Sequence, residues 1–391
     1  MIERFIVQEI LKSAKSYPVV TLTGPRQSGK TTLVRSLFPK KPYVSLESPD
    51  VRLSAIHDPR SFLANYPEGA VLDEVQRVPQ LLSYIQTLVD ENQRVGEYIL
   101  TGSENFALLQ GVTQSLAGRT RVLTLLPFSF GELRQLPDAP NDLWSVLFSG
   151  GYPRIYDQHI EPSMWHSDYV ATYLQRDVRQ ITNIGDLDTF QTFLQLCAGR
   201  TAQLLNLSNL GADAGITHNT VKSWISVLQA SYIGFTLAPY FRNLNKRLVK
   251  TPKFHFYDTG LICYLLGIRE PAQLAEHPLR GAIFESWVVS EVAKVRAQRG
   301  LQVYGGLYFY RDKSGREIDL IIDEGTRAQA VEIKSGATIA TDFFTHLDYF
   351  RKEVQNDPLL MQATSALVYG GNTTEHRHDT HVLSWRDVGL L

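Results

Sequence analysis

Short apolar runs alternate with longer amphipathic segments along the first 160 residues of the chain. The apolar runs predict strands at Val19–Thr23, Tyr43–Leu46, Ala70–Asp73, Tyr98–Thr101 and Val122–Leu126. The segments between these runs have the apolar spacing of helices. Strands that alternate with helices are typical of a parallel sheet covered on both faces, so the pattern predicts an α/β domain over residues 1–160.

From residue 161 to residue 270 the spacing of the apolar positions is mostly helical. It predicts helices at Ser167–Asn183, Thr189–Ala198, Leu207–Ala214 and Thr217–Leu228. Ser208 and Thr217 are suitable N-caps for the last two helices, and Gly215 occupies the turn between them. We therefore predict a helical linker followed by a helix-turn-helix, which the strand-like run Phe235–Phe241 extends to a winged helix.

Residues 271–391 combine helical spacing with strand-like alternation. The pattern predicts a helix at Gly281–Arg296 and strands at Glu317–Ile322 and Ala330–Lys334. Both strands carry charged side chains among apolar ones, which is unusual for a buried strand and favours a functional site over a solvated edge. The sequence therefore predicts a second α/β domain at the end of the chain.

A glycine-rich loop joins the first predicted strand to a helix-like segment, Thr32–Phe38. The loop consists of Gly24, Pro25, Arg26, Gln27, Ser28, Gly29, Lys30 and Thr31, which is the pattern G-x-x-x-x-G-K-[ST]. The N–H groups of such a loop and of the following helix face the phosphates of a nucleotide. Lys30 can reach the β- and γ-phosphates, and Thr31 can offer its hydroxyl to Mg²⁺. We predict that Gly24 to Thr32 bind ATP with Mg²⁺.

Two further strand ends carry polar residues suited to ATP hydrolysis. The third predicted strand ends at Asp73, which would hold the Mg²⁺ shell, followed by Glu74, which would polarise the attacking water. The alternative for these two is a solvated acidic pair at a strand end. The fourth predicted strand ends near Thr101 and Ser103, either of which could sense the γ-phosphate.

Two arginines precede the fifth predicted strand. A phosphoryl-transfer site gains from a cation on the developing charge, which a neighbouring subunit often supplies. Arg119 is the first candidate for this role and Arg121 the second, with a surface arginine as the alternative.

The composition restricts the classes of partner. With 391 residues the chain has room for two or three domains. Its net charge of −1 creates no overall positive field that would attract nucleic acid, so any basic surface has to be local. Cys197 and Cys263 lie among apolar residues without metal-binding spacing, which indicates buried thiols in a reducing compartment. No apolar run approaches about 18 residues, so we expect a cytoplasmic protein without a membrane partner.

Exposed polar residues on the predicted winged helix suggest contact with nucleic acid. The candidates on the second helix of the helix-turn-helix are His218, Asn219, Lys222 and Ser223. A basic run without acidic residues follows, containing Arg242, Lys246, Arg247, Lys250 and Lys253. In a winged helix this run would lie on the hairpin, where it could contact phosphates. A protein–protein module with a solvated basic face remains the alternative.

The order of these elements resembles AAA-type ATPases. The segments LDEVQRVPQLL, ILTGSENFALL, LAGRTRVLTLLPFSFGEL and GGYPRIY resemble a group of prokaryotic ATPases with an uncharacterised C-terminal domain, and FHFYDTGLICYLLG extends the resemblance. It implies a five-stranded core sheet and a lid in which Gly150 to Pro153 approach the base. It also implies a homo-oligomer, such as a hexamer, assembled through Arg119. The turn at Asp258 we interpret as a strand-to-helix cap.

The last domain resembles the PD-(D/E)xK nuclease superfamily, because Asp319 is followed by Glu332 and Lys334 on the next predicted strand. Side chains alternate between the two faces of a strand, so Glu332 and Lys334 share a face, as do Glu317 and Asp319. The resemblance implies that Asp319 and Glu332 hold Mg²⁺ and that Lys334 positions water.

The resemblance further implies an accessory role for the carboxylate of Glu285. Domains of this kind either bind or cleave DNA, and fold similarity does not decide between the two. His376, His378 and His381 lie in a polar turn without partner ligands, and we assign no metal to them.

Two functions of different class are compatible with these features. The first is an oligomeric ATPase that acts on DNA, reading its structure, such as a branch, rather than its sequence. The second is a nucleotide-controlled switch whose C-terminal modules bind protein partners without DNA chemistry. Sequence-specific transcription regulation ranks below both, because the polar side chains of the predicted recognition helix define no base code.

Overall fold

The computed structural model describes residues 2–103, 115–173, 187–240, 250–325, 327–354, 363–377 and 379–391. The chain forms two compact units. The first contains Met1–Phe128, Ala230–Tyr232 and Arg296–Val303, and the second contains Ser129–Gln229, Ile233–Val295 and Tyr304–Leu391. Two short segments from late in the sequence thus complete the N-terminal unit.

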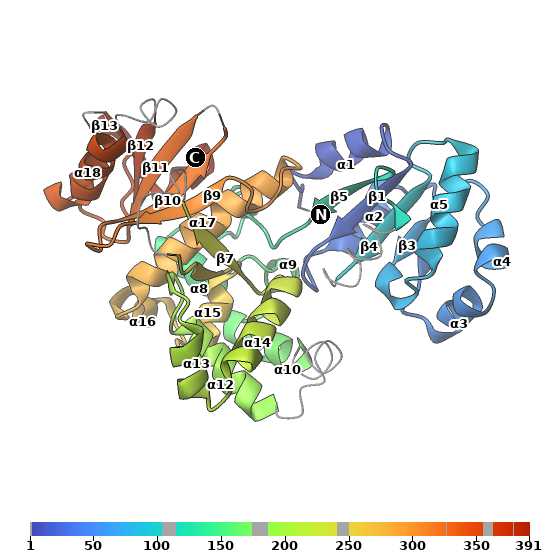
Figure 1. The fold of residues 1–391 in the computed structure, drawn as a ribbon, viewed down its shortest axis with the longest axis horizontal. Coiled ribbons are helices and arrows are strands. Elements are labelled where there is room, and N and C mark those ends of the chain that lie inside the picture. Colours follow the sequence, from blue (N-terminus) through green and yellow to red (C-terminus); the bar gives the residue numbers. More distant parts are fainter. Residues whose placement is uncertain are drawn as a thin grey trace. The chain divides into compact units, whose positions relative to one another are not determined.

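The first unit is built on a five-stranded parallel sheet with the order β2-β3-β4-β1-β5 (Figure 1). The strands are β1 Val19–Thr23, β2 Tyr43–Ser45, β3 Val71–Asp73, β4 Tyr98–Gly102 and β5 Thr120–Thr124. The five strands expected from the apolar runs are therefore confirmed. The fifth begins earlier than predicted, because Thr120 and Arg121 pair with Val19 and Val20 although neither is apolar.

Helices cover both faces of this sheet (Figure 1). The helices are α1 Val7–Ala14, α2 Lys30–Leu37, α3 Pro49–His57, α4 Pro59–Ala64 and α5 Leu81–Asn92, with a 3-10 turn η1 at Val75–Arg77. Side chains of α1 and α2, such as Ile10 and Leu33, pack with Val20 of β1. Side chains of α3 to α5, such as Ile85, pack with Leu72 on the other face. The strands β1, β3 and β4 are buried throughout, as expected for a covered parallel sheet.

The second unit begins with helices. They are α7 Phe130–Leu133, α8 Leu143–Ser149, α9 Pro153–Asp157, α10 Pro162–Tyr173, α12 Leu187–Ala198, α13 Leu207–Ala214, α14 His218–Ala230, α15 Thr259–Leu265 and α16 Pro271–Glu276. Thr217 caps α14 as predicted, because its Oγ1 accepts from Thr220 N at 3.2 Å, and Gly215 takes the left-handed conformation in the turn. The predicted cap of α13 was wrong. Asn206, not Ser208, caps this helix, because the Asn206 side chain reaches the free N–H groups of Ser208 and Asn209.

A nine-stranded sheet, in the order β13-β14-β12-β11-β10-β9-β7-β8-β6, forms the rest of the second unit. Its strands are β6 Gln203–Leu204, β7 Gly234–Pro239, β8 Lys253–Phe256, β9 Leu307–Arg311, β10 Glu317–Asp323, β11 Ala328–Lys334, β12 Thr364–Tyr369, β13 Glu375–Arg377 and β14 Thr380–Ser384. The antiparallel hairpin β7–β8 has the place of the predicted wing. The hairpin joins the C-terminal strands through parallel pairing of β7 with β9. A single sheet therefore contains strands from both sides of the domain boundary that the sequence predicts after residue 270.

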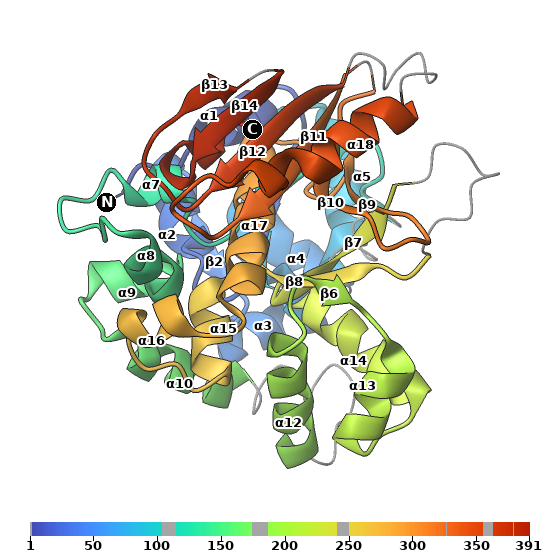
Figure 2. The ribbon, with the colours of Figure 1, turned by 90° about the vertical axis from the view of Figure 1, so that its left-hand side faces the viewer.

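Two long helices accompany this sheet, α17 Arg280–Gln298 and α18 Thr345–Val354, with 3-10 turns η3 Thr341–Phe344 and η4 Trp385–Leu390. Figure 2 shows α18 along β10 and β11, and its Leu347 and Phe350 pack with Ile321 of β10. Among the described residues, no helix combines the length and the apolar character that a bilayer crossing requires.

Candidate functional site: a phosphate loop and a carboxylate cluster

Two glycines shape the predicted phosphate loop after β1. Gly24 has a φ of 144°, and a Cβ there would lie 2.1 Å from the carbonyl oxygen of Leu125. Gly29 has a φ of 92° and directly precedes α2 without a side-chain cap. Because no side chain caps these first N–H groups of α2, they are suited to an anionic ligand.

Lys30 is buried at the first position of α2. Its ammonium donates to the carbonyl oxygens of Gly24 at 2.8 Å and Pro25 at 2.7 Å. The carbonyl oxygen of Pro25 also accepts from the hydroxyl of Ser28 at 3.0 Å. Two side chains of the loop therefore hydrogen-bond to the main chain of the same loop. The lysine therefore lies against the loop that would enclose the phosphates.

Asp73 is the centre of a group of hydroxyls. Its Oδ2 accepts from Thr31 at 2.9 Å and from Tyr43 at 2.6 Å, and its Oδ1 accepts from Thr101. The structure thus brings together Thr31 and Asp73, the two Mg²⁺ ligands predicted for the nucleotide site. The sequence does not predict the contact of Tyr43 with Asp73, because a tyrosine at the start of a strand belongs to no nucleotide-binding motif. Burial, reinforced by the hydrogen bond to Asp73, raises the pKa of Tyr43.

Glu74 follows Asp73 in a left-handed conformation, with a φ of 59°. Its Oε2 accepts from Gln76 Nε2 at 2.5 Å and from the Ser103 hydroxyl at 3.1 Å. The two candidates at the end of β4 therefore have different partners, because Thr101 contacts Asp73 and Ser103 contacts Glu74. A left-handed non-glycine residue is uncommon and concentrates at functional sites.

Arg4 supports the phosphate loop from the N-terminus of the chain. Its guanidinium donates to the carbonyl oxygens of Ser28 at 2.9 Å and Leu126 at 2.7 Å, and it lies over the ring of Phe128. The sequence offered no signal for this contact, because its partners lie 24 and 122 residues away.

Arg119 lies at the N-terminal end of β5. It forms a two-pronged ion pair with Asp90 of α5, with nitrogen–oxygen distances of 2.6 and 2.8 Å. Arg121 instead donates to the carbonyl oxygen of Gly300 at 2.6 Å. The phosphate loop follows the opposite, C-terminal end of the parallel neighbour β1. The chain therefore places Arg119 at the sheet edge that faces away from its own loop.

The segment predicted to approach the nucleotide base belongs to the second unit. Gly151 N donates to Asp258 Oδ2 at 2.7 Å, and Tyr152 is buried against Trp165. Pro153 starts α9. Asp258 also accepts from Leu261 N at 3.1 Å, so its predicted capping role is confirmed. A nucleotide contact by Pro153 stays a prediction.

The predicted nucleic-acid contacts divide into three groups. On α14, His218, Asn219, Lys222 and Ser223 are exposed, as the helical spacing implies. Lys250 is also exposed, whereas Arg242, Lys246 and Arg247 lie outside the described residues. Lys253, assigned to the same basic run, is only 2% exposed, and its expected exposure was wrong. It is buried because its ammonium pairs with carboxylates of the second unit, at 2.7 Å from Glu285 Oε1.

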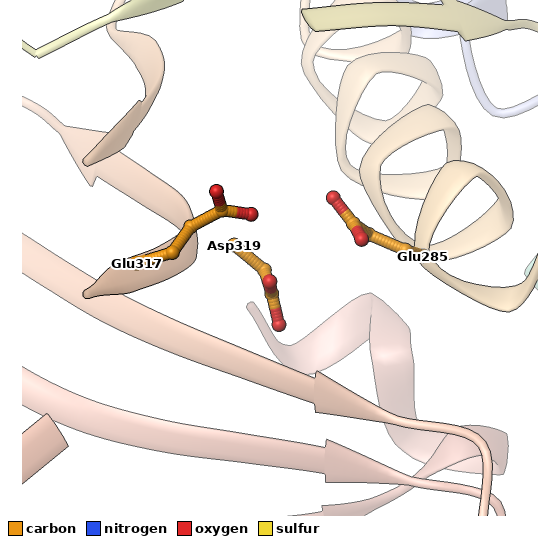
Figure 3. A group of neighbouring side chains, drawn as sticks. All are labelled: Glu285, Glu317 and Asp319. Atoms are coloured by element: carbon orange, nitrogen blue, oxygen red, sulfur yellow. The ribbon is translucent and has the colours of Figure 1, made fainter. Parts of the chain in front are cut away.

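These carboxylates form a compact group, which we call the carboxylate cluster (Glu285, Glu317 and Asp319). Figure 3 shows Glu285 reaching from α17 toward Glu317 and Asp319 of β10. One oxygen from each residue lies within 4.8 Å of the others. Burial raises the pKa of Glu285 despite the neighbouring ammonium of Lys253. The sequence predicts only that Glu317 shares a strand face with Asp319, and the structure adds its place in the cluster.

Glu332 and Lys334 complete the predicted nuclease-like set on β11. Lys334 Nζ lies 2.5 Å from Glu332 Oε1 and 3.8 Å from Asp319 Oδ2. Asp319 Oδ2 also accepts from Ile333 N at 2.8 Å, which ties β10 to β11. The second oxygen of Glu332, Oε2, is buried without a hydrogen-bond partner among the described residues. Burial, reinforced by the charge of Asp319, raises the pKa of Glu332.

Three histidines and two cysteines remain from the sequence candidates. Among the described residues, His376 and His381 stack with ring centroids 4.4 Å apart on the β13–β14 hairpin, without a carboxylate or thiol in a metal-binding group with them. His378 lies outside the described residues. Cys197 and Cys263 are buried free thiols, and burial raises the pKa of both.

Three parts of the chain match the models of known protein families. Residues 16–134 match the family described as AAA domain. Residues 140–272 and 280–388 match two families, each described as a domain of unknown function (DUF8612 and DUF4143, respectively). Uncharacterized proteins of Mycobacterium tuberculosis and Mycobacterium bovis are each 29% identical over 324 residues, which cover 82% of this chain and 71% of each relative.

Solved structures resemble this chain more distantly. The Walker-type ATPase of Pyrococcus abyssi has a TM-score of 0.44 at 16% identity, covering 68% of this chain and 96% of that one. AMPPCP-bound DnaA from Aquifex aeolicus has a TM-score of 0.30 at 16% identity, covering 57% and 86%. At these TM-scores neither structure assigns a role. The AAA domain match, together with the loop geometry, supports a P-loop ATPase of the AAA type that binds ATP.

Proposed function

We propose that this chain is a magnesium-dependent ATPase that works as a homo-oligomer on DNA and recognises DNA structure, such as a branch, rather than sequence. The observation that carries the proposal is the 2.9 Å contact between Thr31 and Asp73. It joins the phosphate loop to the acidic end of β3 within the unit that matches the AAA domain. The alternative, in which Asp73 and Glu74 are only a solvated acidic pair at a strand end, does not account for this contact with the loop.

The residues around Asp73 fit a magnesium ion. Thr31 and Asp73 would hold it, and oxygen ligands of this kind are those that Mg²⁺ prefers. When bound, the ion neutralises charge on the phosphates. Lys30 would exchange the carbonyl oxygens of Gly24 and Pro25 for phosphate oxygens. Glu74 would leave Gln76 to accept a hydrogen bond from the attacking water and orient it.

Arg119 fits a role in a neighbouring subunit. Its carbonyl oxygen accepts from Val19 N, four residues before the end of β1, so about 13 Å of strand separates it from its own phosphate loop. Its ion pair with Asp90 is exposed, and exposed pairs are weak, so the guanidinium can exchange partners. Arg121 is bound to the main chain at Gly300 and is the poorer candidate.

Exposed side chains of the second unit provide the DNA contacts in this proposal. His218, Asn219 and Lys222 lie on one side of α14, whereas Val221 and Trp224 are buried on the other. Lys250 would contact phosphate, as would Arg242, Lys246 and Arg247. Since phosphate contacts carry no sequence information, this surface favours recognition of DNA structure.

The residues at Asp319 also fit a divalent ion. The buried Oε2 of Glu332 lacks a hydrogen-bond partner among the described residues, and an unpaired buried carboxylate oxygen is costly unless a cation or proton satisfies it. Asp319 and Glu332 would hold the ion, which activates water in nucleases of this type. Lys334 would orient that water.

Metal-dependent cleavage has a direct test. We expect nicking of DNA in Mn²⁺ or Mg²⁺ that is lost in Asp319→Ala. Nicking that persists in this variant would place the activity elsewhere. Binding of DNA without nicking would leave the domain as a DNA-binding module.

The competing function, a switch for protein partners, has one observation in its favour. Lys253 and Lys334 both pair with carboxylates inside the second unit. Each ammonium would have to leave its carboxylate before it could contact a DNA phosphate. ATP hydrolysis measured with duplex, single-stranded and branched DNA separates the two functions. We expect stimulation by DNA, strongest for branched DNA, that falls as the salt concentration rises. A rate that no DNA form changes would favour the switch.

A further inference from the structure

Lys253 is an ammonium held inside the carboxylate cluster. It contacts Glu285 at 2.7 Å, pairs with Glu317 and lies 5.5 Å from the ring centre of Phe309. Burial alone would lower the pKa of Lys253, but the neighbouring carboxylates, Glu285 first, outweigh it and raise the pKa above its usual value. The side chain is therefore charged in the folded protein.

The backbone of Lys253 is fixed on both sides. β8 pairs with β7, where Lys253 lies opposite Leu237, and with β6, where it lies opposite Leu204. Both neighbouring strands hold the main chain of Lys253, and its ion pairs with Glu285 and Glu317 hold the ammonium at the cluster. A buried charge of this kind loses its hydration, which ion pairs and hydrogen bonds have to offset.

The same oxygens have the spacing of a metal site. One oxygen each from Glu285, Glu317 and Asp319 lie within 4.8 Å of one another. A divalent ion takes oxygen ligands at about 2.0–2.6 Å, which places neighbouring ligand oxygens within about 5 Å. An ammonium and a divalent ion would compete for these oxygens.

We infer that Lys253 stands in for a second divalent cation, so that the nuclease-like region takes a single ion, at Asp319 and Glu332. This inference rests on the proposed metal-binding function of Asp319 and Glu332. In this arrangement Glu285, expected as an accessory group of the metal site, is instead the partner of Lys253. Lys253 is a positioning residue, because it fixes Glu285 and Glu317 without contacting the reacting atoms.

Counting bound Mn²⁺ ions tests the inference, using the full nucleotide-free chain and electron paramagnetic resonance. We expect one ion per chain for the natural protein and two for Lys253→Met, which keeps an unbranched side chain, one atom shorter, without the charge. Lys253→Arg, which keeps a cation, should still bind one. Lys253→Met/Glu317→Gln should return to one, because the added site loses a ligand that the first site does not use.

A folded Lys253→Met variant that binds no more Mn²⁺ than the natural chain would overturn the inference. If the natural chain binds none, the proposed site at Asp319 and Glu332 fails, whereas the difference between the two proteins still tests Lys253.

Should Lys253→Met lose its cooperative unfolding transition, Lys253→Gln/Glu285→Gln replaces it, since it removes one charge of each sign. This variant should bind Mn²⁺ more tightly than Glu285→Gln alone. Equal affinity for these two would also overturn the inference.

Discussion

Asp73 and Asp319 are both buried aspartates on strands, but different groups surround them. Asp73 accepts hydrogen bonds from three neutral hydroxyls, of which Thr31 belongs to the phosphate loop. Asp319 lies among other carboxylates, whose charge Lys253 and Lys334 offset. In the proposed function the first environment receives its cation together with the nucleotide, whereas the second already contains two ammonium groups of the chain itself.

The comparison predicts that two lysines have separate effects. Lys30→Ala should reduce ATP turnover to background, because the loop loses its charge on the phosphates. Lys334→Ala should leave turnover unchanged and remove DNA nicking in Mn²⁺. Turnover by phosphate release and nicking of supercoiled plasmid, measured on both variants, check this. Normal turnover in Lys30→Ala would refute the nucleotide site.

Arg119→Ala should lower the turnover number by about 10²–10³-fold, since one donor to the developing charge is lost. Binding of a fluorescent ATP analogue should not change. Arg121→Ala is the matched control and should have a much smaller effect on turnover. Mixing Arg119→Ala with Lys30→Ala should restore part of the activity if the arginine acts on a neighbouring subunit. Without recovery, the role in a neighbouring subunit is refuted.

Asp258 is a buried carboxylate with a structural role and provides a reference for the other two. Burial opposes ionisation, but hydrogen bonds from His166 and the main chain outweigh it and lower the pKa of Asp258. Its contribution to stability is therefore present above the unfolded pKa, near 3.8, and is lost as the pH falls through the folded value. Asp258→Asn should cost about 2–3 kcal/mol of unfolding free energy at pH 7.

Urea unfolding of this variant at pH 7 and at pH 3, below the unfolded pKa, provides the measurement. The difference from the natural protein should shrink at the lower pH, because both proteins then approach the same charge state. A difference that does not depend on pH would show that the carboxylate acts through shape alone.

Tyr43→Phe should have the smallest effect. The Tyr43 hydroxyl occupies Asp73 Oδ2, which the ion shell would use, so its loss should lower the Mg²⁺ concentration for half-maximal turnover by about fivefold, equivalent to about 1 kcal/mol. Tyr84→Phe on α5 is a suitable control. A higher Mg²⁺ requirement would instead show that Tyr43 orients Asp73.

Local patterns in the sequence predicted the core of the first unit and its loop. Gly24, Gly29, Lys30 and Thr31 act as neighbours in the chain, so their spacing alone carries the geometry. The five strands followed because each is an apolar run, and only β5 was misplaced, where edge pairing recruits the polar residues Thr120 and Arg121.

The sequence did not predict which side chains pair with the buried charged groups. Lys253 sits in a basic run and was expected at the surface, yet its partner Glu285 lies 32 residues away. Arg4 reaches Leu126, 122 residues away, and Tyr43 reaches Asp73 from a neighbouring strand. The sequence by itself determined which residues can carry charge and which loop can hold phosphate. Only the tertiary structure decided which charges are buried together, because an ion pair inside a protein depends on which strands and helices meet, and sequence distance does not record that.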